Sequence, residues 1–120
     1  MPGTAVPHDH IRASTVKGTA VYNADREHLG HIDDVVLRKA DGRAAFAILS
    51  FGGFLGIGEK LHPLPWQSLS YEPVLGGYVV NVTREQLEAA PSYVPTDEPD
   101  WDDPQYGESL GRYYGGYPLI

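Results

Sequence analysis

The sequence predicts a small, mainly β protein. We expect an antiparallel β-barrel with one short helix after its last strand and an aromatic, acidic C-terminal tail. Short runs rich in β-branched and aromatic residues alternate with turn signals from about residue 18 to residue 82. One helix-start signal follows the last run. A chain of 120 residues suits one domain, and because it has no cysteine it carries no disulfide.

The first predicted strands are separated by turn clusters. Residues 18–22 form a β-prone run that stops at the turn cluster 23–25, and a second run covers residues 29–37. Asp41-Gly42 separates that run from residues 45–51. Asp-Gly between two apolar runs predicts a hairpin, because glycine accepts the positive φ of a tight turn.

The strand predicted at residues 45–51 is apolar on both faces. Phe46 and Ile48 lie on one face and four apolar side chains lie on the other. A sheet closed on itself covers one face of such a strand. A second element must therefore cover Phe46 and Ile48.

The remaining elements are short. Residues 60–64 predict a strand at a sheet edge or bulge, because Pro63 has no amide hydrogen to donate. Residues 65–69 predict one helical turn, in which we interpret Trp66 as an anchor of the core. Residues 78–82 predict the last strand.

A short helix is expected directly after this strand. Thr83 and Gln86 have the spacing of a capping box, in which each side chain bonds the backbone amide of the other residue. Pro91 ends the helix because proline cannot continue a helical hydrogen-bond ladder.

Composition divides the chain into three parts. We predict a flexible leader at residues 1–14, a barrel domain at 15–90 and a tail at 91–120. The tail carries six acidic residues, one arginine and six of the 13 aromatic residues. Because the aromatic rings need apolar surface to cover them, we expect the tail to pack on its own barrel or on a second subunit.

Charge and hydropathy exclude several classes of function. The net charge of −7 argues against direct nucleic-acid binding, which needs a basic surface. The longest purely apolar stretch, residues 44–49, is far shorter than the roughly 18 residues of a membrane span. The first residues do not have the pattern of a signal peptide, so we expect a cytoplasmic protein.

Three stretches resemble the PRC-barrel family, which is named for the H subunit of the photosynthetic reaction centre and shared with the C-terminal domain of the ribosome maturation factor RimM. They are Val21-Tyr22-Asn23 with residues 29–37 (Leu-Gly-His-Ile-Asp-Asp-Val-Val-Leu), residues 47–60 around the glycine-rich centre, and Leu64-Pro65-Trp66. Pro99-Asp100-Trp101 and Tyr113-Tyr114-Gly115 are similar to a segment of free-standing bacterial members. The resemblance implies a strongly bent barrel that contacts other macromolecules, with no common catalytic residues. Neither the membrane helix of the H subunit nor the N-terminal barrel of RimM is recognisable, so neither specific role is transferred.

The glycine-rich segment at residues 52–60 superficially resembles a phosphate-binding loop. Glu59 stands where that motif requires lysine, and its carboxylate would repel phosphate. We instead interpret the glycines as backbone requirements of a strand connection. The residues assigned such structural roles are Gly30, Gly42, Gly52, Gly53, Gly56, Gly58 and Trp66.

No catalytic or metal-binding constellation is recognisable. Asp33 and Asp34 are neighbours on a predicted strand, so their side chains point to opposite faces and cannot easily share a proton or an ion. No serine has the context of a nucleophile elbow. The histidines have no recognisable supporting shell for a metal; they are His8, His10, His28, His31 and His62. We therefore expect no catalysis, metal or cofactor.

The sequence thus predicts a non-enzymatic protein-interaction or assembly module, a homodimer that binds an unidentified protein and has no small-molecule substrate. Phe54 and Leu55 either cap the barrel or meet the partner. The candidate partner or dimer contacts are Phe46, Ile48, Phe54, Leu55, Ile57, Trp101, Tyr106, Tyr113 and Tyr114. A barrel that binds a small molecule or metal is the alternative. A further alternative is an accessory protein of the ribosome or of a photosynthetic complex.

Overall fold

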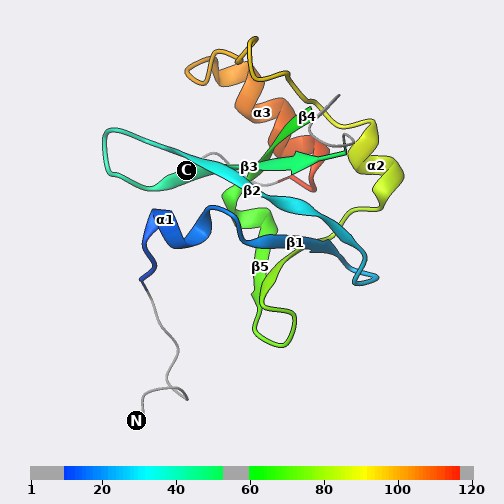
Figure 1. The fold of residues 1–120 in the computed structure, drawn as a ribbon. Coiled ribbons are helices and arrows are strands. Elements are labelled where there is room, and N and C mark those ends of the chain that lie inside the picture. Colours follow the sequence, from blue (N-terminus) through cyan, green and yellow to red (C-terminus); the bar gives the residue numbers. More distant parts are fainter. Residues whose placement is uncertain (1–9, 53–59, 117–120) are drawn as a thin grey trace.

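One six-stranded sheet, curled into a half-barrel, organises the residues that the computed structural model describes, 10–52 and 60–116 (Figure 1). The strand order across the sheet is β4-β3-β2-β1-β6-β5. The mainly β fold predicted from the sequence is confirmed. The strands are β1 Ala20–Asn23, β2 His28–Leu37, β3 Ala44–Phe51, β4 Lys60–Pro65, β5 Leu69–Glu72 and β6 Gly77–Val80.

Short helices lie at the margins of the sheet, and the longest of them packs beside β4 (Figure 1). They are α1 Ala13–Val16, the 3₁₀ turn η2 Trp66–Ser68, α2 Arg84–Glu88 and α3 Pro104–Tyr113. Within the described part of the chain, none of the helices has the length and apolar character that crossing a membrane requires.

All neighbouring strands pair antiparallel except β1 and β6, which pair parallel through Val21 with Tyr78 and Tyr22 with Val79. The sequence predicts an antiparallel sheet, and this one pair departs from it. The reason is topological. The β5–β6 hairpin returns the chain beside β1 after β2, β3 and β4 have been placed, and β6 then runs in the direction of β1.

Two glycines set the shape of the long central strands. Gly42 has a φ of 74° in the β2–β3 turn, where Arg38 donates to the Arg43 carbonyl at 2.8 Å, so the predicted Asp-Gly hairpin is confirmed. Gly30 lies opposite Phe51, and a Cβ atom there would overlap the backbone carbonyl oxygen of Ser50. Only glycine therefore permits β2 and β3 to approach this closely.

The interior of the curled sheet is filled by aliphatic side chains. Val21, Ile32, Leu49 and Leu64 come from four different strands and have no exposed surface. Trp66 packs against this core, with its ring 6.0 Å from that of Tyr78.

The outward side of the edge strand β4 has an amide donor at Leu61 and none at its two prolines. Leu61 pairs outward with Tyr93, through hydrogen bonds of 3.0 and 2.9 Å. Because backbone groups alternate along a strand, Pro63 and Pro65 also face outward, where their missing amide hydrogens leave no donor. The prediction that Pro63 marks an edge strand is confirmed.

The predicted capping box forms at the start of α2. The Thr83 hydroxyl accepts from the Gln86 amide at 3.0 Å, and the Gln86 side chain accepts from the Thr83 amide at 2.8 Å. The elements α1, β5 and α3 were not predicted. Helix α3 begins at Pro104, and the Asp103 carboxylate caps it by accepting from the Gln105 amide at 3.0 Å.

Candidate functional site

The predicted contact residues Phe46 and Ile48 are buried within the chain, with 6% and 2% of their surface exposed. The Trp101 ring lies on Phe46, with centroids 5.8 Å apart and the two planes at 34°. Trp101 also contacts Tyr93 and Tyr106 edge-on. In the single chain, a tail residue thus covers part of the second apolar face of β3.

The three tyrosines in and directly after α3 differ in burial and in hydrogen bonding. Tyr113 is 40% exposed and its hydroxyl donates to the Gln86 carbonyl oxygen. Tyr106 is half-buried, and burial raises the pKa of its hydroxyl. Tyr114 is buried, its hydroxyl has no hydrogen-bond partner, and burial raises its pKa above the ordinary value.

Six residues of the glycine-rich segment that the sequence singled out lie outside the described residues. They are Gly53, Phe54, Leu55, Gly56, Ile57 and Gly58. Gly52, just before them, has a φ of 76°.

Burial and nearby carboxylates raise the pKa of the Tyr93 hydroxyl. Burial raises the pKa of Tyr93 to about 12, with Glu98, Asp33 and Asp34 adding to the effect because an anionic phenolate would be repelled by their carboxylates. Asp33 and Asp34, adjacent on β2, lie near this side of the sheet. The Asp34 carboxylate accepts from the Val35 amide at 2.8 Å, which is a local backbone contact.

His62 is a buried imidazole on β4 with no exposed surface, and neither ring nitrogen makes a hydrogen bond of standard geometry with another described residue. Its ring meets the edge of Phe51 at 5.5 Å. Burial lowers the pKa of His62 to about 4, the charge of Lys60 adds to this, and the Pro91 backbone opposes it. Across residues 10–52 and 60–116, no group of three or more potential metal ligands is gathered.

The β5–β6 hairpin, at the lower end of the view in Figure 1, carries two exposed apolar side chains. Val74 is 85% exposed and Tyr71 is 55% exposed. We call Tyr71 and Val74 the hairpin tip. The Glu72 carboxylate accepts from the Val74 amide at 3.2 Å, and the Gly76 amide donates to the Glu72 carbonyl at 2.9 Å.

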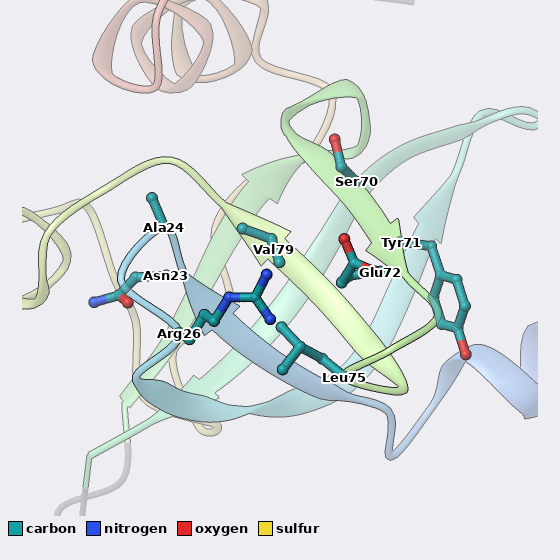
Figure 2. Close-up of a pocket in the computed structure, with 8 residues that line it drawn as sticks. All are labelled: Asn23, Ala24, Arg26, Ser70, Tyr71, Glu72, Leu75 and Val79. Carbon is teal, nitrogen blue, oxygen red and sulfur yellow. The ribbon is translucent and has the colours of Figure 1, made fainter.

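Beside the hairpin tip lies a half-open pocket of about 260 Å³ (Figure 2). Val79 forms part of its floor and lies on the face of β6 opposite to the buried Tyr78 and Val80, so the pocket is on the outer face of the sheet. The lining residues are Asn23, Ala24, Arg26, Ser70, Tyr71, Glu72, Leu75 and Val79.

Arg26 enters this pocket from the β1–β2 turn. Figure 2 shows its guanidinium above Val79, between Leu75 and Glu72. Arg26 has a φ of 67°, the one positive φ outside glycine in the described part of the chain. Its guanidinium makes no hydrogen bond or ion pair with another described residue.

Asn23 holds this turn in place. It is 1% exposed, and its side-chain oxygen accepts from the amides of Asp25 and Glu27 at 3.0 and 2.9 Å. Its amide nitrogen donates to the Glu27 carboxylate at 2.7 Å. The turn is therefore rigid, and it fixes the direction in which Arg26 leaves the backbone.

Sequence reasoning did not select Arg26, Ser70 or Glu72. The turn cluster at residues 23–25 was a visible signal for the β1–β2 turn. Nothing local indicated that the turn meets β5 and β6, because that contact depends on the parallel pairing of β1 with β6 across more than 50 residues.

Comparison with known proteins adds a family and a structural likeness. A family model described as the PRC-barrel domain matches residues 8–87. No curated protein matches the chain. Among solved structures, a 16S ribosomal RNA processing protein, RimM, from Pseudomonas aeruginosa is similar with 20% sequence identity and a TM-score of 0.43. The match covers 70% of this chain and spans half of that protein.

Proposed function

The chain belongs to the PRC-barrel domain family, and we propose that it acts as a non-enzymatic protein-interaction module of that type. The observation that supports the proposal is the hairpin tip, where Val74 is 85% exposed and Tyr71 is 55% exposed. Tyrosine is enriched in protein interfaces, so an exposed tyrosine and an exposed valine on one hairpin offer contact area to a partner.

The hairpin tip is also held rigidly. Four residue pairs join β5 to β6, and Glu72 closes the turn with both its carbonyl and its carboxylate. A partner that binds Val74 and Tyr71 therefore loses little free energy to ordering the hairpin. Tyr71 contacts Tyr78 edge-on at 5.5 Å, which fixes the direction of its ring.

The size of the hairpin tip indicates the kind of contact. Stable interfaces bury about 1,200–2,000 Å² in total, whereas an aromatic side chain contributes about 150–250 Å². Two side chains supply a small part of a stable interface, so we infer a transient partner that also uses the neighbouring polar surface. Homodimerisation and a cytoplasmic location are predictions within the same proposal, and sedimentation equilibrium measures the first.

Association with a ribosome or a photosynthetic complex is a narrower form of this proposal. The net charge of −7 disfavours direct contact with RNA, so such an association would proceed through protein contacts.

Site-specific photo-crosslinking in cells tests the interaction proposal. A photoreactive phenylalanine analogue replaces Val74 in one variant and Leu37 in the control, because Leu37 is an apolar residue on the other hairpin with 53% of its surface exposed. We expect discrete protein adducts at position 74 that are reduced by Tyr71→Ser and that are absent at position 37. Equal adduct patterns at both positions, or none at position 74, would contradict the proposal.

A further inference from the structure

The pocket beside Arg26 has the chemistry of a small-molecule site. We propose that it binds an aliphatic α-amino acid, whose carboxylate pairs with Arg26, whose ammonium group pairs with Glu72 and whose side chain rests on Leu75 and Val79. This inference goes beyond the proposed protein contact, because it concerns a small molecule held between Arg26 and Glu72. Tyr71 is the hairpin-tip residue that also lines the pocket.

The volume of the pocket sets the size of the ligand. Its 260 Å³ lies below the roughly 300–1,000 Å³ of pockets that hold drug-sized molecules. A ligand smaller than a drug-sized molecule, such as leucine, isoleucine or valine, therefore suits this pocket.

Arg26 supplies a guanidinium that is available to bind a carboxylate. Its guanidinium has no described partner, and a guanidinium presents a planar pair of donors that matches a carboxylate. A positive φ outside glycine costs roughly 1–2 kcal/mol and persists where the surroundings enforce it. The bonds of Asn23 enforce it here, and their result is a guanidinium directed over the pocket floor (Figure 2).

Glu72 supplies the complementary charge from the opposite wall. It lies on β5, and Figure 2 shows its carboxylate at the pocket beside Val79, facing the region that Arg26 reaches. One of its oxygens accepts from the Val74 amide at 3.2 Å, which restrains the carboxylate. No ion pair joins Arg26 to Glu72 within 4.0 Å, so both charges are free to pair with a ligand between them.

The charges around the pocket favour a zwitterionic ligand over a simple anion. Asp25 and Glu27 flank Arg26 in the turn, and Glu72 faces it, so an anion without a positive group meets a net negative surrounding. An ammonium group on the same ligand offsets this repulsion by pairing with Glu72. Ser70, which pairs with Val79 across the hairpin, adds a hydroxyl at the pocket wall.

The apolar part of the pocket selects the side chain of the ligand. Val79 and Leu75 are half-buried aliphatic residues on the floor and rim. A branched aliphatic side chain covers both, whereas a charged or amide side chain would lose hydration there without gaining a partner.

Titration followed by amide chemical shifts of the full chain tests the site. Three probes separate the sources of the ligand chemistry: L-leucine carries both charges, N-acetyl-leucine has the carboxylate of a peptide C-terminus, and leucinamide has the ammonium of a peptide N-terminus. We expect saturable shifts at the amides of Arg26, Ser70 and Val79 with L-leucine, and affinities about tenfold lower for the other two probes.

Two variants test which residue pairs with each charge of the ligand. Arg26→Gly removes the guanidinium and fits the positive φ without strain, so the fold is retained while L-leucine binds at least about tenfold more weakly. Glu72→Gln keeps an acceptor for the Val74 amide and also weakens L-leucine binding. Arg43→Ala, in the exposed turn of the other hairpin, is the matched control and leaves binding unchanged.

The outcomes are distinct. Absence of saturable shifts up to millimolar L-leucine overturns the proposal, as does binding that survives Arg26→Gly. Equal affinity for L-leucine and N-acetyl-leucine overturns the free amino acid as ligand and indicates a peptide C-terminus. None of these results depends on whether crosslinked protein partners are found at position 74.

Discussion

The indole ring of Trp101 lies on the phenyl ring of Phe46, at a centroid distance of 5.8 Å. Phe46 belongs to β3, the strand next to the edge strand β4, and Trp101 lies in the segment between α2 and α3. This contact and the burial of Leu110 and Tyr114 make the segment after residue 90 part of the hydrophobic core of the chain.

Trp101→Ala tests this coupling. We expect it to lower the free energy of unfolding by about 3 kcal/mol, the lower end of the range for truncating a large buried aromatic, because Trp101 is only half-buried. Urea denaturation measures the change. Tyr113→Ala, at a residue with 40% exposure, is the control and should cost much less. Equal costs for both variants would show that the Phe46 contact contributes nothing specific.

His62 makes the free energy of unfolding depend on pH in the acidic range. Its folded pKa is lowered to about 4 from an ordinary 6.5, so between these pH values the unfolded chain binds a proton that the folded chain excludes. Stability is therefore fully present above pH 6.5 and is lost as the pH falls toward 4, by roughly 3 kcal/mol from this residue.

The measurement is the midpoint of urea unfolding as a function of pH for wild type and His62→Leu. The variant should lose the slope between pH 6.5 and 4, and the exposed His31→Gln should retain it. A wild-type slope in the His62→Leu variant would exclude His62 as its source.

Gly30 allows β2 to approach β3. Gly30→Ala places a Cβ against the Ser50 carbonyl oxygen, which belongs to backbone and cannot rotate away. We expect a loss of about 3 kcal/mol or more in the free energy of unfolding, measured by urea denaturation. Gly42→Ala is the matched control. Its Cβ meets open space and only the positive φ is strained, which costs about 1–2 kcal/mol. A larger loss for Gly42→Ala than for Gly30→Ala would be incompatible with this packing.

Tyr114 carries a buried hydroxyl that has no hydrogen-bond partner among residues 10–52 and 60–116. Tyr114→Phe removes the cost of burying that hydroxyl, so we expect thermal unfolding to show a gain of about 1 kcal/mol. The raised pKa of Tyr114 also means that the unfolded chain loses its phenolic proton first, so stability falls as the pH rises above 10. The Phe variant should lose less stability there. Tyr71→Phe, at an exposed residue, is the control and should not give this gain of about 1 kcal/mol at neutral pH.

The sequence predicted those elements whose signals are local. The Asp41-Gly42 turn and the Thr83–Gln86 capping box depend on residues within a few positions of one another, and both form as expected. Helix α3 was missed because Gly107 and Gly111 weaken its intrinsic helix propensity. In the structure both glycines are buried, and packing offsets that weakness.

Strand β5 and the pocket were missed for another reason. Ser70 and Glu72 on either side of Tyr71 have weak strand propensity, and β5 is specified by its partner β6. The pocket brings Arg26 to Glu72 through the pairing of β1 with β6, and no short motif encodes that meeting. The placement of Phe46 under Trp101 likewise depends on tertiary contacts, although the alternation of Phe46 and Ile48 along the strand indicated that something covers them.

The prolines on the outward side of β4 make the two margins of the sheet unequal. An extended segment of another molecule finds no backbone amide donor at Pro63 or Pro65, and the backbone of Leu61 is already paired with Tyr93. Fibril growth by strand templating is therefore obstructed at this margin. Within the described sheet, the other edge strand is β5, which has only four residues. Aggregation by strand pairing is therefore confined to this short edge.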